Sequence, residues 1–351
     1  MTPPGRPRND NPDAAPEGLP APAARAPAFA DSAALHQWLG AAHAAEYSGG
    51  LSNHLPMALL ALHRLGACEA RLQAFAAAYA PRLARAPAAQ AWPAGDAWTP
   101  RLGEPAAEPA YRGLFLEWLA REDPNDVLRQ VLPRLMMGCG GAAFHGLIRT
   151  AYAVQAARRQ ELAHALGYWA SRWLDLGADA PVTAIQSNPV AALRQVPVPR
   201  RAPAGDLIFQ RMQTVAAQPR FAAAVAGLDV SEGSLEQLAR GAAQLYAASG
   251  NFTVLHLLTS AHALRVLMPW LDDEPLAAVR PYWRAFAAAW AASGARDIGP
   301  PELLAWRQIV NRAVASDDEH VVKLVDSCRE QEAAYGGTEW LHAASRAVRH
   351  A

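Results

Sequence analysis

Four segments of this chain share one pattern, which limits the folds that the chain can adopt. Each segment begins a helical stretch close to a histidine, and these histidines are His54, His145, His256 and His320. A second helical stretch follows with aromatic residues, which are Phe75 and Tyr79, Tyr168 and Trp169, Tyr282 and Trp283, and Trp340. The spacing is too irregular for a solenoid. We therefore expect helical hairpins whose histidines can meet at one centre, as in bundle cores that bind metals.

The composition favours helices along the whole chain. Hydrophobic residues make up 52% of the 351 residues, mainly as Ala and Leu, and β-branched residues are sparse. Such a composition favours helices over strands. We predict an all-α fold in which residues 29–351 form a single large domain built from several helical hairpins.

Proline-rich stretches interrupt the helical pattern. Residues 1–28 are rich in Pro, Ala and Gly with little to bury, so we predict a disordered N-terminal tail. Residues 81–109 and 195–205 are predicted to be long surface loops. Histidine-bearing segments lie on both sides of each loop, which favours one domain over two.

Charge and cysteine content exclude several classes of protein. The formal net charge is zero, so we expect neither a nucleic acid nor an anionic membrane as a partner. No apolar run is long enough to span a membrane and no signal peptide is recognisable, so we expect a cytoplasmic protein. Cys68, Cys139 and Cys328 are widely separated. They fit neither a disulfide framework nor a zinc ribbon, and we expect buried, reduced core residues.

Lys323 is the only lysine among the 32 basic residues. An arginine keeps its proton in a protein, whereas a buried lysine can become a neutral, nucleophilic amine. Such an amine can form a Schiff base, or it can capture carbon dioxide as a carbamate and become an anionic oxygen ligand. Lys323 lies three residues after His320, so both side chains share one helix face. The alternative is that compositional drift from Lys to Arg left one lysine by chance.

Two of the four histidines have an informative context. His145 follows a Gly-rich run at 138–141, which allows close approach of the backbone. His256 lies in an almost continuous apolar run, so it is expected to be buried and to need a partner for its ring nitrogens. A metal would supply one partner. A hydrogen bond to Thr259, Ser260 or a backbone carbonyl is the alternative.

The remaining histidines have weaker support as ligands. His63 lies nine positions after His54, on the opposite face of the same helix. His262 is turned away from His256 and is at most a neighbour of the ligands. His164 belongs to a charged helix and is predicted to be solvated. No supporting context is found for His36, His43, His342 and His350.

Four imidazoles and a carbamylated Lys323 would define the metal by their chemistry. Four neutral nitrogens and one anionic oxygen suit a divalent transition metal, for which Fe²⁺ is the natural choice. Zinc favours four ligands, and magnesium or calcium favours oxygen. Burial and a nearby cation would both lower the pKa of the lysine. We expect Asp317, Asp318 and Glu319 at the helix start, where carboxylates cap backbone amides.

The segments described above resemble the questin oxidase-like family, whose characterised fungal members oxidise or open rings of anthraquinone-type polyketides. The resemblance runs from about Glu46 to the C-terminal helix and rests on NHLPMALLALHRLGA, FHGLIRTAYAV, FTVLHLLTSAHAL and DDEHVVKLV. Fungal relatives have further histidines where this chain has Met57 and Arg149. We expect this difference to change which substrate is bound more than which metal is bound.

The resemblance implies an all-helical fold and, for at least part of the family, a non-haem iron held by four histidines and a carboxylated lysine. The matching residues are His54, His145, His256, His320 and Lys323. The implied function is an iron-dependent oxygenase that uses dioxygen to oxidise or cleave a ring of a small aromatic or quinone-like substrate. Tyr47, Tyr152 and Trp306 are candidates for the pocket lining, with core packing as the alternative for each.

Two other functions stay open at this point. One is an NADPH-dependent oxidase of Baeyer-Villiger type, although no dinucleotide fingerprint is present in the sequence. The other is a helical interaction scaffold without enzymatic activity, in which the histidines are structural.

Overall fold

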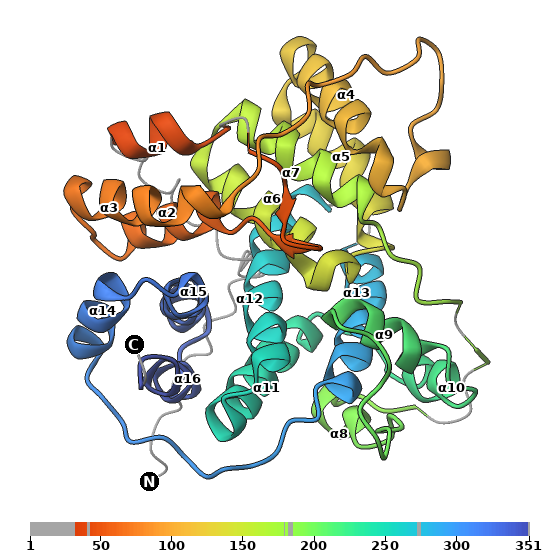
Figure 1. Cartoon of the computed structure of the whole chain (residues 1–351). Coiled ribbons are helices and arrows are strands. Elements are labelled where there is room, and N and C mark those ends of the chain that lie inside the picture. The colour runs from red at the N-terminus through yellow and green to blue at the C-terminus, as the bar shows by residue number, and fades with distance from the viewer. Residues whose placement is uncertain (1–31, 41–42, 179, 182–184, 272–274, 350–351) are drawn as a thin grey trace, which may run out of the picture. The chain divides into compact units, whose positions relative to one another are not determined.

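A computed structural model describes residues 32–40, 43–178, 180–181, 185–271 and 275–349. All of these residues belong to the unit that spans Asp31–Ala351. The predicted tail at residues 1–28 lies outside the described residues. Within them, regular structure consists of α-helices, short 3₁₀ turns and one two-stranded antiparallel sheet, so the all-α prediction is confirmed (Figure 1).

The helices follow one another along the whole of the described chain. The α-helices are α1 Ala33–Trp38, α2 Leu55–Arg64, α3 Glu69–Tyr79, α4 Glu108–Arg121, α5 Pro124–Met136, α6 His145–Ala156, α7 Arg159–Ser171, α8 Pro189–Leu193, α9 Ile208–Ala216, α10 Phe221–Ala226, α11 Ser234–Ser249, α12 Phe252–Leu267, α13 Pro275–Ala292, α14 Trp306–Ala315, α15 Glu319–Tyr335 and α16 Glu339–Ala347. The 3₁₀ turns are η1 Ala80–Arg82, η2 Thr99–Arg101, η3 Pro105–Ala107, η4 Gly141–Phe144 and η5 Met268–Trp270. The two strands are β1 Glu46–Tyr47 and β2 Leu51–Ser52.

The four predicted hairpins are present as α2–α3, α6–α7, α12–α13 and α15–α16, and the two helices of each pair are in contact. The aromatic residues of the second helices are buried, which explains why the pairs hold together. In the first hairpin, the Tyr79 hydroxyl accepts a hydrogen bond from the His54 backbone N–H at 3.2 Å. In the second, Gly146 is required because a Cβ there would lie 2.7 Å from Trp169.

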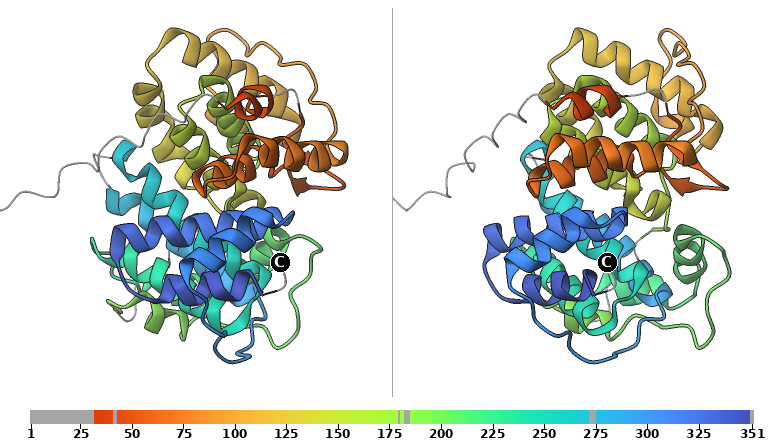
Figure 2. Two further views of the ribbon diagram at one scale, coloured as in Figure 1. Left: turned by 90° about the vertical axis from the view of Figure 1, so that its left-hand side faces the viewer. Right: turned by 60° about the vertical axis from the view of Figure 1, so that its left-hand side comes forward.

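The first helices of the four hairpins form a closed ring. Helix α2 contacts α6 and α15, and α12 contacts the same two helices from the other side. Figure 1 shows α12 with α15 on one side and α13 on the other. Figure 2 shows α15 and α16 (blue) below α2 and α3 (orange), and α15 is in contact with α2. Because each first helix begins at or near a histidine, this ring places the four histidines around one centre.

The predicted loops and cysteines agree with the structure in part. Between η1 and α4 the chain contains the short turns η2 and η3 and an isolated bridge of Arg85 to His43, and residues 195–205 contain no helix. Cys139 and Cys328 are buried free thiols, but Cys68 is exposed, so its prediction as a core residue was wrong. Cys68 occupies the N-cap position of α3, where a helix start reaches the surface. Among the described residues, none of the helices has the length and apolar character needed to cross a membrane.

Candidate metal centre

Local structure places all four histidines in the N-terminal turns of their helices. His54 is the N-cap residue of α2 and His145 is the first residue of α6. His320 is the second residue of α15, whose start is fixed by the Asp318 side chain accepting from the His320 backbone N–H at 2.8 Å. His256 lies in the second turn of α12. The positive ends of four helix dipoles are thereby gathered at one site.

The four imidazoles form a ring in the same order as their helices. The distances between ring centroids are 4.6 Å for His54–His145, 5.0 Å for His145–His256, 5.7 Å for His256–His320 and 4.5 Å for His320–His54. The structure therefore brings together four histidines that are spread over 267 positions of the sequence, from 54 to 320 inclusive. It places them as the sequence pattern predicted.

Backbone carbonyls orient two of the rings. Nδ1 of His256 lies 2.8 Å from the carbonyl oxygen of Phe252, and Nδ1 of His145 contacts the carbonyl oxygen of Ala142. A carbonyl oxygen only accepts, so each Nδ1 carries the proton and each Nε2 keeps its lone pair. Nε2 of His145 is buried and has no hydrogen-bond partner among the described residues. A buried nitrogen without a partner is costly, and a metal ion would provide the missing partner.

Lys323 completes the cluster from the next turn of α15. Its side chain is 1% exposed, and its Nζ lies 2.6 Å from Nδ1 of His54. Burial lowers the pKa of Lys323 to about 7, although the nearby carboxylates of Glu319 and Asp318 act in the opposite direction. A large fraction of the amine is therefore neutral near physiological pH, which is the form that reacts with carbon dioxide.

All four imidazoles are held in the neutral form. Desolvation is the main cause of the lowered pKa of His54, His145, His256 and His320, and for His256 the pKa falls to about 3. Mutual repulsion among these groups and Lys323 lowers the pKa values further. Neutral imidazole is the form that binds a transition metal, so the donor set fits such an ion.

The imidazoles open into a cavity of about 440 Å³. This volume lies within the range of small-molecule sites. Apolar side chains line it, and these are Tyr47, Leu51, Leu207, Ile208, Phe209 and Phe252. Arg82 also lines the cavity and donates a hydrogen bond to the Tyr47 hydroxyl at 2.7 Å. The cavity can hold a small molecule next to the histidines, with both apolar and polar side chains around it.

Of the three aromatic residues considered for the lining, only Tyr47 reaches this cavity. Tyr152 is buried elsewhere and donates its hydroxyl proton to Asp326 at 2.8 Å. Trp306 donates its indole N–H to Glu332 at 2.8 Å. Both hydrogen bonds lead to residues of α15. Core packing, the alternative, therefore applies to Tyr152, whereas Trp306 is half-buried and belongs neither to the core nor to this cavity.

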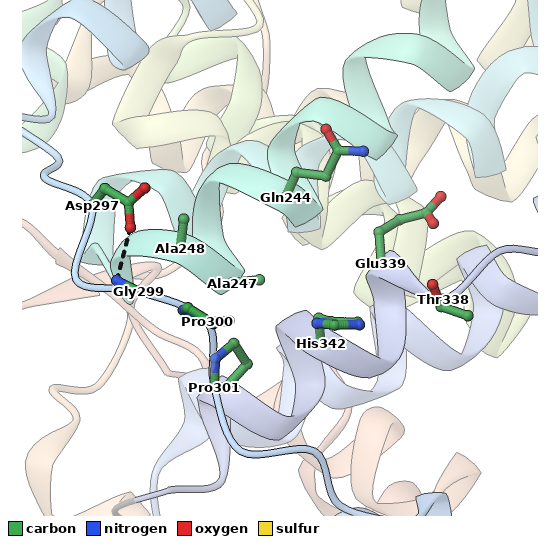
Figure 3. Close-up of a pocket in the computed structure, with 10 residues that line it drawn as sticks. All are labelled: Gln244, Ala247, Ala248, Asp297, Gly299, Pro300, Pro301, Thr338, Glu339 and His342. Atoms are coloured by element: carbon green, nitrogen blue, oxygen red, sulfur yellow. Dashed lines mark hydrogen bonds between the residues drawn. The ribbon is translucent and has the colours of Figure 1, made fainter.

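A second cavity of about 440 Å³ lies between α11, residues 297–301 and the start of α16, and Figure 3 shows its lining. Its carboxylates already have partners, since Asp297 accepts from the Gly299 backbone N–H at 2.8 Å and Glu339 pairs with Arg240. None of the four clustered histidines lines this cavity. It offers no comparable set of metal donors.

The prediction for His164 was wrong. His164 is buried, and desolvation lowers its pKa to about 4. Glu161, three residues before it, faces inward and forms a buried ion pair with Arg149 at 2.6 Å. His262 is buried as well, with Nδ1 3.1 Å from the Ser327 hydroxyl, and neither it nor His63 lines the cavity.

Sequence reasoning missed two features of the centre. Glu319 was expected only at the helix start, yet it is buried and lines the cavity. Its position four residues before Lys323 places both on one helix face and could have revealed it. The other feature is a left-handed turn before His145, in which Ala142, Ala143 and Phe144 all have positive φ. Nothing in these residue types signals such a turn.

The fold and the centre define a class of protein: an all-helical protein in which four histidines and a lysine converge beside an apolar cavity. The chain matches the questin oxidase-like family over residues 51–328, which covers most of its length and includes all four histidines and the lysine. It belongs to that family. A comparison with curated proteins finds no match. Family membership implies an oxidoreductase that acts on an aromatic substrate of the polyketide type.

Proposed function

We propose that this chain is a non-haem iron oxygenase that oxidises or cleaves a ring of an aromatic, quinone-like substrate. The proposed ligands are His54, His145, His256, His320 and a carboxylated Lys323. When bound, ferrous iron supplies the one-electron chemistry through which dioxygen reacts with organic molecules. The proposed partners are a small aromatic molecule and dioxygen.

The observation that carries this proposal is the convergence of four neutral imidazoles on one cavity. Burying such groups without partners is unfavourable. A purely structural role would leave Nε2 of His145 buried without a partner among the described residues. Nitrogen donors of this number favour iron or another transition metal over magnesium or calcium.

The burial of Lys323 and its lowered pKa support carbamylation. The neutral amine attacks carbon dioxide, a bond forms between Nζ and the carbon, and one proton is released to solvent. The product is an anionic carbamate in place of a cation. Because the four imidazoles contribute no negative charge, this anion would strengthen the binding of a divalent metal.

The cavity supports an aromatic substrate. Its apolar residues come from three parts of the chain, represented by Leu51, Phe209 and Phe252. They would exclude water from the faces of a ring system and hold it beside the imidazoles. Polar groups at Arg82 and Tyr47 can bind an oxygen substituent and so orient the ring.

Oxygen consumption tests the proposed activity. Protein reconstituted anaerobically with Fe²⁺ is mixed with oxygenated buffer and a panel of hydroxylated anthraquinones, and products are identified by mass. We expect oxygen uptake coupled to incorporation of oxygen into one substrate, and loss of both in His256→Ala. Iron-loaded protein that leaves every quinone unchanged, with or without a reductant, would contradict the proposed reaction.

The same assay decides whether NADPH takes part as a reductant. The sequence contains no dinucleotide fingerprint, so we expect any electron supply to be interchangeable with a simple chemical reductant such as ascorbate. Turnover that requires NADPH specifically would support the Baeyer-Villiger alternative.

A further inference from the structure

Glu319 is a buried carboxylate that takes no part in capping its helix. Its neighbour Asp318 provides the N-cap, whereas Glu319 is 7% exposed and lines the histidine cavity. Its closest ionic contacts among the described residues are long, at 3.6 Å to Nη1 of Arg82 and 3.8 Å to Nδ1 of His320. Buried carboxylates normally have short, well-formed partners. Glu319 therefore has unused capacity as an acceptor.

The carboxylate of Glu319 lies close to two of the imidazoles. One ligand atom each from His54, Glu319 and His320 lie within 4.8 Å of one another. Two imidazoles and one carboxylate form the donor set of many non-haem Fe²⁺ sites. Glu319 and Lys323 are also one helical turn apart on α15, so both approach the centre from the same side.

Electrostatics favour a carboxylate ligand at this place. An imidazole and an amine offer no negative charge to a metal, and the N-termini of the helices that border the centre add positive potential. A divalent cation at this site would need negative charge close by. Glu319 is the buried carboxylate that the structure places among the candidate ligand atoms.

We propose that Glu319 is a direct ligand of the metal when Lys323 carries no carbon dioxide, so that the centre keeps an anionic ligand while the carbamate is absent. The inference rests on the proposed function, because it concerns the same metal ion. It predicts that carbon dioxide tunes metal affinity and is not a condition for metal binding.

Metal affinity measured with and without carbon dioxide tests this inference. Metal-free protein is dialysed anaerobically against Fe²⁺ in carbon dioxide-depleted buffer and in buffer with bicarbonate. The native chain should bind in both, and more tightly with bicarbonate. Glu319→Gln should weaken binding by about tenfold or more, with the larger loss in depleted buffer. Asp317→Asn is the matched control. Asp317 lies two residues before Glu319, and its side chain is exposed, so the variant removes one negative charge that does not face the centre.

A further variant separates ligation from an indirect role through Arg82. Arg82→Gln removes the cation that contacts Glu319. If Glu319 is a ligand, this variant should bind the metal at least as tightly as the native chain. If Glu319 acts only by holding Arg82, both variants should lose affinity together. Co²⁺ bound in place of iron provides a second measurement, since loss of a ligand should change its visible absorption spectrum.

The outcomes distinguish the two proposals. A native chain that binds no Fe²⁺ in either buffer would overturn the proposed function and this inference with it. A native chain that binds Fe²⁺, together with a Glu319→Gln variant of equal affinity and an unchanged Co²⁺ spectrum, would overturn only the role of Glu319.

Discussion

At the scale of single residues, the chemistry of the centre depends on Lys323. The chain uses arginine at every other basic position, and arginine would bring a permanent charge into the cluster. Lys323 instead contacts Nδ1 of His54 at 2.6 Å within a set of neutral imidazoles. Unlike an arginine, a lysine at this position can lose its charge.

The lowered pKa of Lys323 predicts how the stability of the metal-free protein depends on pH. The pKa is about 7 in the folded chain and 10.5 in its ordinary state. Between these values the unfolded chain binds the additional proton, so the free energy of unfolding rises with pH, by at most about 1.4 kcal/mol per unit. As the pH falls towards 7 this stability is lost.

The variant Lys323→Met isolates that contribution. Urea denaturation of both proteins, free of metal and carbon dioxide, should give a difference in unfolding free energy that changes steadily from pH 7 to pH 9. Every other titrating group is shared by both proteins and cancels in the comparison. Parallel pH profiles would show that Lys323 is not a buried, perturbed amine.

Residues at the centre also show what the sequence could and could not predict. The four histidines were predictable because each stands near a helix start with an apolar face behind it. The burial of His164 was not predictable, because the charged residues near it in the sequence suggested exposure to solvent. In the structure, Glu161 is paired with Arg149 inside the protein. Glu319 was misread because an acidic run at a helix start has a sufficient explanation in capping, which Asp318 alone fulfils.

At the scale of elements, the turn η4 fixes the position of His145. Three successive L-residues adopt the left-handed region, with φ of 46° at Ala142, 54° at Ala143 and 68° at Phe144. Each such residue costs about 1–2 kcal/mol. The preceding Gly141 is sterically required, since a Cβ there would lie 1.7 Å from the carbonyl oxygen of Arg172.

The turn shows why tertiary structure limits prediction from sequence. Ala and Phe disfavour the left-handed region, so no local signal points to it. Packing imposes the turn, and the result is a carbonyl at Ala142 that orients the His145 ring. Strain of this kind is commonly found at functional sites.

Glycine substitutions test the strain in the turn. Ala143→Gly removes a buried methyl group but relieves the left-handed backbone, so we expect the unfolding free energy to change by less than about 1 kcal/mol. Ala151→Gly is the matched control within α6, where a glycine and a lost methyl group should together cost about 1.5 kcal/mol or more. Chemical denaturation measures the unfolding free energy of both variants. Equal losses of unfolding free energy in the two variants would contradict a strained backbone at Ala143.

At the scale of the whole domain, four hairpins each contribute one histidine to the same centre. The contacts α2–α6, α6–α12, α12–α15 and α15–α2 repeat the order of the imidazoles. A metal bound there would connect helices that are far apart in sequence. The sequence predicted the hairpins, but the closed ring depends on long-range packing that local patterns do not encode.

Metal binding should therefore stabilise the folded domain. A ligand at one hundred times its dissociation constant adds about 2.7 kcal/mol to the free energy of unfolding. We expect the native chain to unfold at a higher temperature with Fe²⁺ than with a chelator in anaerobic calorimetry. His256→Ala should abolish the difference, and His342→Ala, outside the centre, should retain it. A native chain whose unfolding temperature is the same in both conditions would contradict a metal shared by the four hairpins.

The most direct test of the central claim is the iron content of protein purified without a metal-affinity tag, compared between the native chain and Lys323→Arg. The guanidinium cannot take up carbon dioxide, and it places a permanent charge beside His54. We predict close to one iron per native chain and its loss in the variant, with both proteins folded. Folded protein that was expressed with iron and contains no transition metal in either form would contradict the account and leave the cluster with a structural role.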